Sequence, residues 1–188
     1  MGDNVRIIAG EAKNRIIKTR KGFDTRPTLE SVKESLFSII ATYIEGSVFL
    51  DLFSGSGSIS LEAISRGAKR AVMIEKDGEA LKYIIENIDN LAFSDRCRAY
   101  KNDVIRAIEI LERKNEKFDI IFLDPPYKEN ISTKTIEKIS EENLLEKDGI
   151  IISEHSTYEK MADKIGNFVK YDERDYNKKV VSFYKFED

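Results

Sequence analysis

Apolar residues along the chain follow two alternating patterns. Short runs rich in Val, Ile and Phe have the length and composition of strands that are buried on both faces. Between these runs, apolar residues recur three and four positions apart, which is typical of amphipathic helices. The predicted strands span residues 47–53, 70–75, 96–101, 117–124 and 149–154. The predicted helices span residues 58–66, 77–91, 104–113, 132–143 and, in a shorter segment, 157–164. This alternation predicts an α/β fold with a mostly parallel sheet covered on both faces.

The first 28 residues have a different pattern. Two β-rich runs, 5–9 and 15–19, are separated by a Gly-containing stretch and predict a small hairpin. Pro27 then ends the extended segment, and Thr28 is a suitable N-cap for a helix that ends at Gly46. We therefore expect an N-terminal β-hairpin arm over residues 1–28.

The last two predicted strands form an antiparallel pair. Residues 167–176 and 178–186 are joined by a tight turn around Asn177. With the five earlier strands they make a mostly parallel seven-stranded sheet that ends in an antiparallel hairpin. This arrangement is unusual for dinucleotide-binding folds and is expected of S-adenosylmethionine (SAM) methyltransferases. The pattern therefore predicts a Rossmann-like, SAM-dependent methyltransferase domain over residues 29–188.

Composition excludes several classes of protein. The chain has 188 residues, of which 41% are hydrophobic and 35% charged, and this fits one globular domain. Its longest apolar runs, Ile120–Leu123 and Ile150–Ile152, are too short to cross a bilayer, and the N-terminus lacks the apolar core of a secretory signal. With one cysteine, Cys97, and one histidine, His155, we expect no disulfide and no metal site. We therefore expect a cytoplasmic protein with no membrane or metal partner.

Charge is distributed unevenly along the chain. The net charge is −3, yet residues 1–28 carry seven Lys or Arg against three acidic residues. A basic arm on an acidic body favours a polyanionic partner such as a nucleic acid. A solvated charged hairpin is the alternative. The candidate RNA-binding residues are Lys13, Arg15, Arg20 and Arg26.

The segment Asp51–Gly57 carries the first candidate site. It follows a predicted strand and precedes a helix, and its glycines let the backbone approach a ligand. The match to G-x-G-x-x-G is incomplete because Ser60 stands at the third glycine position. An acid at the strand end, Asp51, suits a ligand with an ammonium group, which favours SAM over a dinucleotide. A tight turn with no ligand is the alternative. The candidate cofactor contacts are Asp51, Phe53, Ser54, Gly55, Ser56 and Gly57.

Two further strand ends carry acidic residues. Glu75, followed by Lys76, ends the strand 70–75, where a carboxylate can accept both hydroxyls of a ribose. Asp103 and Val104 follow the next strand, where the acid can accept the adenine amino group and Val104 can lie against the ring. A surface acid at Glu75 and a plain helix N-cap at Asp103 are the alternatives.

The segment Asp124-Pro125-Pro126-Tyr127 is the most specific signal for chemistry. The two prolines stiffen the turn, so that Asp124 and the Pro125 carbonyl can accept hydrogen bonds from an exocyclic amine. Tyr127 offers a flat face on which a base can stack. Acceptors on the amine hydrogens stabilise the positive charge that develops on nitrogen as a methyl group arrives. A structural proline-rich turn is the alternative.

Together with these motifs, long stretches of the chain resemble the RsmD family of 16S rRNA (guanine-N2) methyltransferases. The stretches that carry the resemblance are RIIAGEAKNRIIK, RPTLESVKESLFSII, DLFSGSGSISLEAISRGAKRAVMIEKD, DPPY and VVSFYKF. The resemblance implies a Rossmann-like fold, SAM as cofactor, and one guanine of 16S rRNA, free or in a small-subunit assembly particle, as target. The chain departs from the expected Tyr-Gly before the last strand, where it has Tyr176-Asn177. Asn tolerates left-handed geometry, so the departure is conservative.

Three other functions stay open at this point. An adenine-N6 methyltransferase acting on DNA or RNA shares the DPPY logic. A nicotinamide oxidoreductase would fit the strand-end acids but not the missing third glycine. A non-enzymatic RNA-binding or assembly factor would fit the basic arm but not the DPPY turn. The sequence leaves the oligomeric state open.

Overall fold

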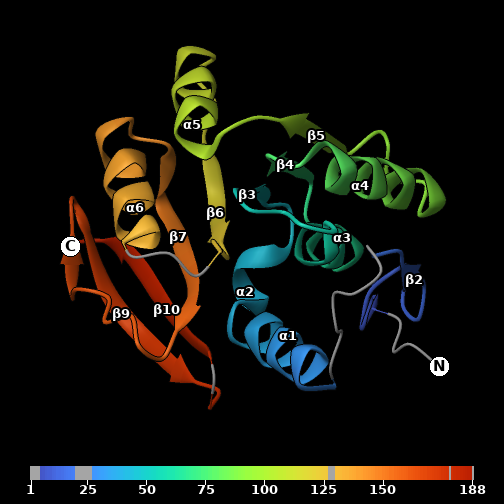
Figure 1. The fold of residues 1–188 in the computed structure, drawn as a ribbon, viewed down its shortest axis with the longest axis horizontal. Coiled ribbons are helices and arrows are strands. Elements are labelled where there is room, and N and C mark those ends of the chain that lie inside the picture. The colour runs from blue at the N-terminus through green and yellow to red at the C-terminus, as the bar shows by residue number, and fades with distance from the viewer. Residues whose placement is uncertain (1–4, 20–26, 127–129, 178, 188) are drawn as a thin grey trace.

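The computed structural model describes residues 5–19, 27–126, 130–177 and 179–187, with the backbone alone described at 27–29. Its main element is an eight-stranded sheet in the order β5-β4-β3-β6-β7-β10-β9-β8 (Figure 1). The strands are β3 (Val48–Asp51), β4 (Arg70–Glu75), β5 (Cys97–Lys101), β6 (Phe118–Leu123), β7 (Leu145–Ser156), β8 (Lys164–Ile165), β9 (Phe168–Asp175) and β10 (Lys179–Phe186). Strands β3 to β7 run parallel to one another, and β10 pairs antiparallel with both β7 and β9. The mostly parallel sheet with an antiparallel C-terminal hairpin is confirmed.

Helices cover both faces of this sheet, as the periodicity predicts. The helices are α1 (Pro27–Ile39), α2 (Ala41–Ile44), α3 (Ser58–Ser65), α4 (Gly78–Asn90), α5 (Val104–Arg113) and α6 (Ile131–Glu141). Apolar residues of α1, α3 and α4 pack on one face with Phe49 and Ile120, whereas those of α5 and α6 pack on the other with Leu50 and Ile121. Neighbouring residues of β3 and β6 therefore serve opposite cores, which is why these strands are apolar at nearly every position.

One predicted helix is wrong. Residues 157–163 form a turn and an irregular segment, and Lys164 already begins β8, which adds an eighth strand to the seven expected. Tyr158 is 96% exposed and Met161 is the one buried residue of 157–163, so this segment lacks the repeated buried positions of an amphipathic helix. Its path is instead fixed by tertiary contacts, since Lys170 Nζ donates to the Met161 carbonyl and the Tyr184 hydroxyl donates to that of Ala162.

The N-terminal hairpin is present, with β1 (Val5–Arg6) antiparallel to β2 (Ile16–Ile17). Ile7 and Ile17 are buried in the same apolar cluster as Phe37 and Ile64, so the arm packs against α1 and α3. The division of the chain at residue 28 stays a prediction.

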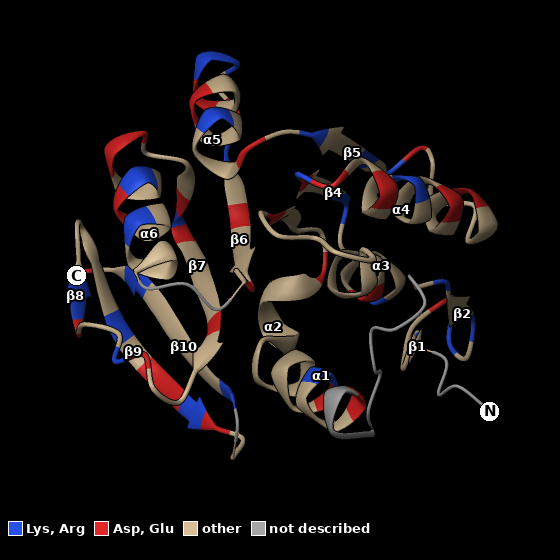
Figure 2. Ribbon diagram, viewed as in Figure 1, with Lys and Arg blue, Asp and Glu red and all other residues tan. Residues whose placement is uncertain are grey.

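Charges of both signs are mixed over the surface helices (Figure 2). Within the described ranges, no helix combines the length and the apolar composition that crossing a membrane requires.

Candidate functional site

A cavity of about 1530 Å³ opens at the carboxyl ends of the parallel strands. Open α/β sheets bind ligands at this edge. Its lining includes Leu52 and Phe53 after β3, Glu75 at the end of β4, Asp103 after β5 and Asp124 after β6. Residues of the arm and of α1 form the opposite wall, among them Arg6 and Lys33. The cavity therefore combines four strand ends with the N-terminal arm.

The turn after β3 is shaped by two left-handed glycines. Gly55 has φ +55° and Gly57 has φ +78°. A Cβ at Gly55 would meet no atom within 4 Å, which leaves its outer side open to a ligand. The Gly57 amide donates to the Ser54 carbonyl at 2.7 Å, and Gly57 is the N-cap of α3. Phe53, Ser54, Gly55 and Ser56 line the cavity, whereas Gly57 shapes the turn behind them.

Asp51 is a buried acid at the floor of the cavity. Its carboxylate accepts hydrogen bonds from Ser60 Oγ at 3.0 Å and from the Phe53 amide at 3.3 Å. Burial outweighs these bonds and raises the pKa of Asp51 to about 7. A cationic group brought to this carboxylate would favour its ionised form.

Glu75 connects two backbone segments of the cavity wall. Its Oε2 accepts from the Gly55 amide and its Oε1 from the Asp77 amide, both at 2.8 Å. Each carboxylate oxygen retains capacity for a further hydrogen bond, so Glu75 can still accept from ligand hydroxyls.

Asp103, which follows β5, is both a helix N-cap and a residue of the cavity wall. Asp103 accepts from the Ile105 amide at 3.1 Å and is the N-cap of α5, and it also faces the cavity beside Val104. Lys76 Nζ lies 3.6 Å from Asp103 Oδ2, in a side chain that is 81% exposed. The N-cap role of Asp103 therefore does not exclude a ligand contact.

Asp124, Pro125 and Pro126 line the cavity after β6. Burial raises the pKa of Asp124, and the nearby Lys179 ammonium opposes this shift. Lys179 Nζ lies 3.9 Å from Asp124 Oδ2 and also pairs with Glu154. Sequence reasoning missed Glu154 and Lys179. Tyr127 lies outside the described residues.

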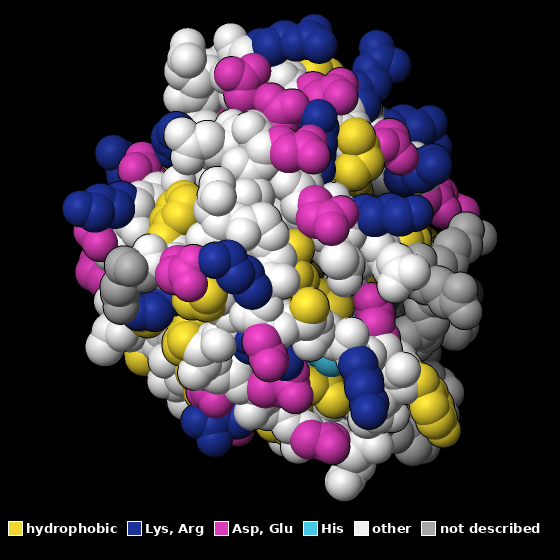
Figure 3. All heavy atoms as spheres, turned by 90° about the vertical axis from the view of Figure 1, so that its left-hand side faces the viewer, with side chains coloured by type: hydrophobic (Ala, Val, Ile, Leu, Met, Phe, Trp, Pro, Cys, Tyr) yellow, Lys and Arg dark blue, Asp and Glu magenta, His cyan; other side chains and the backbone are white. Residues whose placement is uncertain are grey.

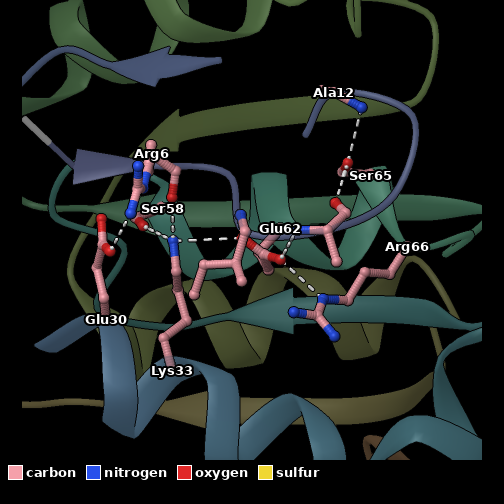
Figure 4. Close-up of polar contacts among 10 residues, drawn as sticks. Arg6, Ala12, Glu30, Lys33, Ser58, Glu62, Ser65 and Arg66 are labelled. Atoms are coloured by element: carbon pink, nitrogen blue, oxygen red, sulfur yellow. Dashed lines mark hydrogen bonds and ion pairs between the residues drawn. The ribbon is translucent and has the colours of Figure 1, made fainter. Parts of the chain in front are cut away.

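The arm is attached to α3 through a buried charge cluster, drawn in Figure 4. Glu62, which is fully buried, accepts from the amides of Ile8 and Ala9 at 2.8 and 3.0 Å. It also accepts from Arg66 Nε at 2.7 Å and lies 3.3 Å from Lys33 Nζ. Lys33 in turn donates to the Arg6 carbonyl at 2.7 Å. Burial lowers the pKa of Lys33, and Glu62 opposes this shift. Sequence reasoning also missed this cluster.

The predicted RNA-binding residues are only partly placed. Lys13 is exposed on the arm, and the Arg15 guanidinium donates to the Asn90 carbonyl at the end of α4. Neither lines the cavity, whereas Arg6 does. Arg20 and Arg26 lie outside the described residues.

His155 and Cys97 are buried away from the cavity lining. His155 Nε2 lies 2.9 Å from Ser182 Oγ, and burial raises the pKa of Cys97 to about 12, which keeps it a thiol. Among the residues that the structure describes, no group of three or more His, Cys, Asp or Glu could hold a metal ion.

Comparison with known proteins places this architecture in a class. Residues 5–185 match the family model described as "Conserved hypothetical protein 95". The chain is 36% identical over 181 residues to "Putative rRNA methyltransferase YlbH" of Bacillus subtilis, covering 96% of this chain and 98% of that one. It is 34% identical over 154 residues to "Ribosomal RNA small subunit methyltransferase D" of Haemophilus influenzae, covering 80% and 78%.

A solved structure agrees over the full fold. "Putative methyltransferase yhhF from Escherichia coli" has a TM-score of 0.85 over 98% of each chain, at 26% identity. The fold is thus the Rossmann-like methyltransferase fold. Within this class, the chain belongs to the RsmD family, to which the matching family model corresponds.

Proposed function

We propose that this protein transfers a methyl group from SAM to the exocyclic N2 amine of a guanine in 16S rRNA of the small ribosomal subunit. The observation that carries the proposal is the position of Asp124-Pro125 on the same cavity as Asp51, the glycine turn and Glu75. The acceptors that we propose for the target amine and those that we propose for SAM therefore line the same cavity. An enzyme with this substrate would act in the cytoplasm.

The side chains present fit SAM as the cofactor. A buried carboxyl at Asp51 suits the ammonium of the amino-acid moiety, and the open face of Gly55 admits a ligand close to the backbone. Glu75 has free acceptor capacity for ribose hydroxyls, and Asp103 with Val104 suits the adenine. Lys76 would contribute through its pairing with Asp103. SAM supplies an electrophilic methyl group at its sulfonium.

The DPP turn would act on the target amine. The lone pair of the guanine amine is delocalised into the ring, so the amine is a weak nucleophile. Asp124 and the Pro125 carbonyl accept hydrogen bonds from its N–H groups, which localises the lone pair and stabilises the charge that forms on nitrogen. The amine proton then leaves to solvent. Tyr127 is proposed as the stacking surface for a base taken out of its helix.

The rRNA partner is supported by the relatives and by the arm. "Ribosomal RNA small subunit methyltransferase D" is the name of relatives in Haemophilus influenzae and Escherichia coli, the latter 33% identical over 154 residues. The arm brings Arg6 to the cavity rim, while Lys13 is exposed beside it. By contrast, the described residues of the face over β9 and α6 mix both signs of charge in Figure 3 and form no broad basic surface there. We therefore propose that the arm side receives 16S rRNA or a small-subunit assembly particle.

Transfer to adenine N6 of DNA or RNA is the alternative, because an acceptor pair serves either amine. The test uses small-subunit particles from cells that lack the gene, incubated with the purified protein and methyl-labelled SAM. Digestion to nucleosides followed by mass spectrometry should give N2-methylguanosine. N6-methyladenosine would support the alternative, and no labelled nucleoside in RNA would contradict the proposal.

A further inference from the structure

Two charged residues on the antiparallel part of the sheet reach the cavity beside Asp124. Glu154 on β7 is opposite Val181 on β10, and Ser156 is opposite Lys179. Residues two apart on one strand point to the same face, so Glu154 and Lys179 are diagonal neighbours on one side of the sheet. Both line the cavity.

Lys179 is placed between two carboxylates. Its Nζ pairs with Glu154 Oε1 and lies 3.9 Å from Asp124 Oδ2. The Glu154 side chain is 9% exposed and that of Lys179 is 22% exposed, whereas the Asp124 side chain retains 41% exposure toward the cavity. The Lys179 ammonium is therefore bound by the buried Glu154 carboxylate on one side. On its other side lies the Asp124 carboxylate, which faces the cavity.

The surroundings of Asp124 disfavour its ionised form, and a cation beside it favours that form. Burial raises its pKa, and the Lys179 ammonium opposes this shift. The charge of Asp124 is in turn one of the causes that raise the pKa of Asp51, so the two acids share one cavity in which negative charge is disfavoured. A protonated Asp124 would lose an acceptor for the amine, because one oxygen would carry a hydrogen. Among the described residues, Lys179 is the cation in contact with this carboxylate.

We propose that Lys179 is a positioning residue that keeps Asp124 ionised and oriented toward the target amine, and that Glu154 holds the Lys179 ammonium in place. The proposal rests on the role of Asp124 in the proposed methyl transfer. Lys179 contacts no reacting atom and acts through Asp124.

The charged groups around Asp124 fix the sign of each expected change. They are Lys179 on β10, Glu154 on β7, Asp51 on β3 and, across the same cavity, Lys134 on α6. Lys179→Met removes the cation in contact, so Asp124 should protonate at higher pH. Lys179→Arg retains a cation and should leave the titration near that of the parent. Glu154→Gln removes a carboxylate that repels Asp124 but also the partner that holds Lys179, so the Asp124 midpoint should move less than in Lys179→Met.

The first experiment titrates Asp124 in the full-length protein without any substrate. Carboxyl ¹³C NMR on aspartate-labelled protein follows the midpoint, and the Asp124→Asn variant assigns the resonance. We expect Lys179→Met to raise the midpoint by about one pH unit, the low end of the effect of an opposite charge at this distance. Lys147→Met, at the far end of β7, is the matched control and should change nothing. An unchanged midpoint in folded Lys179→Met, or an equal rise in Glu154→Gln, would overturn the proposal.

The second experiment measures the consequence for catalysis. In single-turnover methylation of small-subunit particles at saturating SAM, Lys179→Met should move the acid limb of the rate to higher pH while SAM affinity stays unchanged. If Lys179→Met does not fold, Lys179→Gln removes the positive charge but keeps a hydrogen-bond donor for Glu154, and it should raise the midpoint likewise; an unmoved midpoint there also overturns the proposal. A parent protein that methylates no rRNA would contradict the proposed function, whereas the NMR titration still decides the Lys179–Asp124 contact.

Discussion

The Glu75 carboxylate accepts a hydrogen bond from the Gly55 amide at 2.8 Å, so the end of β4 is connected to the turn after β3. Its second oxygen holds the Asp77 amide at the start of α4. One side chain thus fixes two segments of the cavity wall.

Replacing Glu75 should weaken the cofactor site. Glu75→Ala would remove the proposed charge-assisted hydrogen bonds to the ribose, and SAM affinity should fall by roughly 1–3 kcal/mol in calorimetry. Glu75→Gln retains one acceptor oxygen and should lose less. Glu137→Ala, on the exposed side of α6, is the control and should bind SAM like the parent. Unchanged affinity in Glu75→Ala would remove Glu75 from the site.

Asp51 should make stability depend on pH in a direction opposite to that of most acids. Its pKa is raised to about 7, so between about pH 4 and 7 the native state retains a proton that the unfolded chain releases. This contribution to stability therefore falls as pH rises and is fully lost above pH 7. Asp51→Asn cannot ionise. Its free energy of unfolding, measured relative to that of the parent by urea unfolding, should therefore rise by about 2–3 kcal/mol from pH 5 to pH 8.

The same Asp51→Asn variant should bind SAM more weakly, because it loses the carboxylate that we propose for the ammonium. Relative to the parent, Asp51→Asn should therefore gain stability as the pH rises but bind SAM less tightly. A stability difference that is the same at both pH values would contradict the buried ionisation.

The arm should contribute to RNA binding through charge. Neutralising Lys13, Arg15 and Arg20 together should lower the salt dependence of RNA affinity while SAM binding persists. Tested singly, Lys13→Ala should reduce the slope by about one without loss of stability. Arg15→Ala should also lower the melting temperature, since Arg15 donates to the end of α4. An unaltered slope in the triple variant would mean that the arm is structural only.

Gly10 should be essential for attachment of the arm. It has φ +85°, and a Cβ there would lie 1.7 Å from the Ser65 carbonyl oxygen. Gly46 is a matched control, because it has φ +73° but no atom within 4 Å of its Cβ position. Gly46→Ala should cost only backbone strain, whereas Gly10→Ala should cost about 1–3 kcal/mol more in urea unfolding.

Proteolysis checks where that cost falls. In Gly10→Ala the arm should be cut by trypsin at Lys13 and Arg15 faster than in the control. Equal stability and equal cleavage of the two variants would mean that the contact with Ser65 does not hold the arm.

Substitutions at Asp124 and Tyr127 should distinguish the chemical step from the placement of the base. Asp124→Ala should reduce the single-turnover methylation rate by ~10²-fold or more, because it removes the acceptor that we propose for the developing cation. The effect of Tyr127→Phe should be small, because the ring remains. Tyr127→Ala removes the ring and should cost about 1–3 kcal/mol of base stacking. SAM binding should persist in all three. A near-parent rate in Asp124→Ala would mean that the turn is only a scaffold.

Periodicity predicted the parallel part of the fold because these strands and helices each bury a continuous apolar face. Residues 104–113 and 70–75 are predicted with the bounds that α5 and β4 have. The segment 157–164 was predicted wrongly because its conformation depends on distant partners, such as the bond from Lys170 to the Met161 carbonyl. No local pattern encodes such a contact.

The site divides in the same way. Acids at strand ends were predictable because parallel strands bring their carboxyl ends to one edge. Glu154 and Lys179 were not, because their proximity depends on β10 being placed beside β7. Likewise, Lys33 and Glu62 belong to two amphipathic helices whose mutual packing the sequence pattern does not specify.

The order of strands also bears on how the sheet is completed during synthesis. Strand β10 lies between β7 and β9, although both of these are translated before it. Until β10 is added, the edges of β7 and β9 both have unpaired backbone groups, and such edges are templates for aggregation. Premature termination between Asp175 and Lys179 would therefore yield more than a shortened enzyme. It would leave a chain in which the edges of β7 and β9 are unpaired, so that a strand of another chain can pair there.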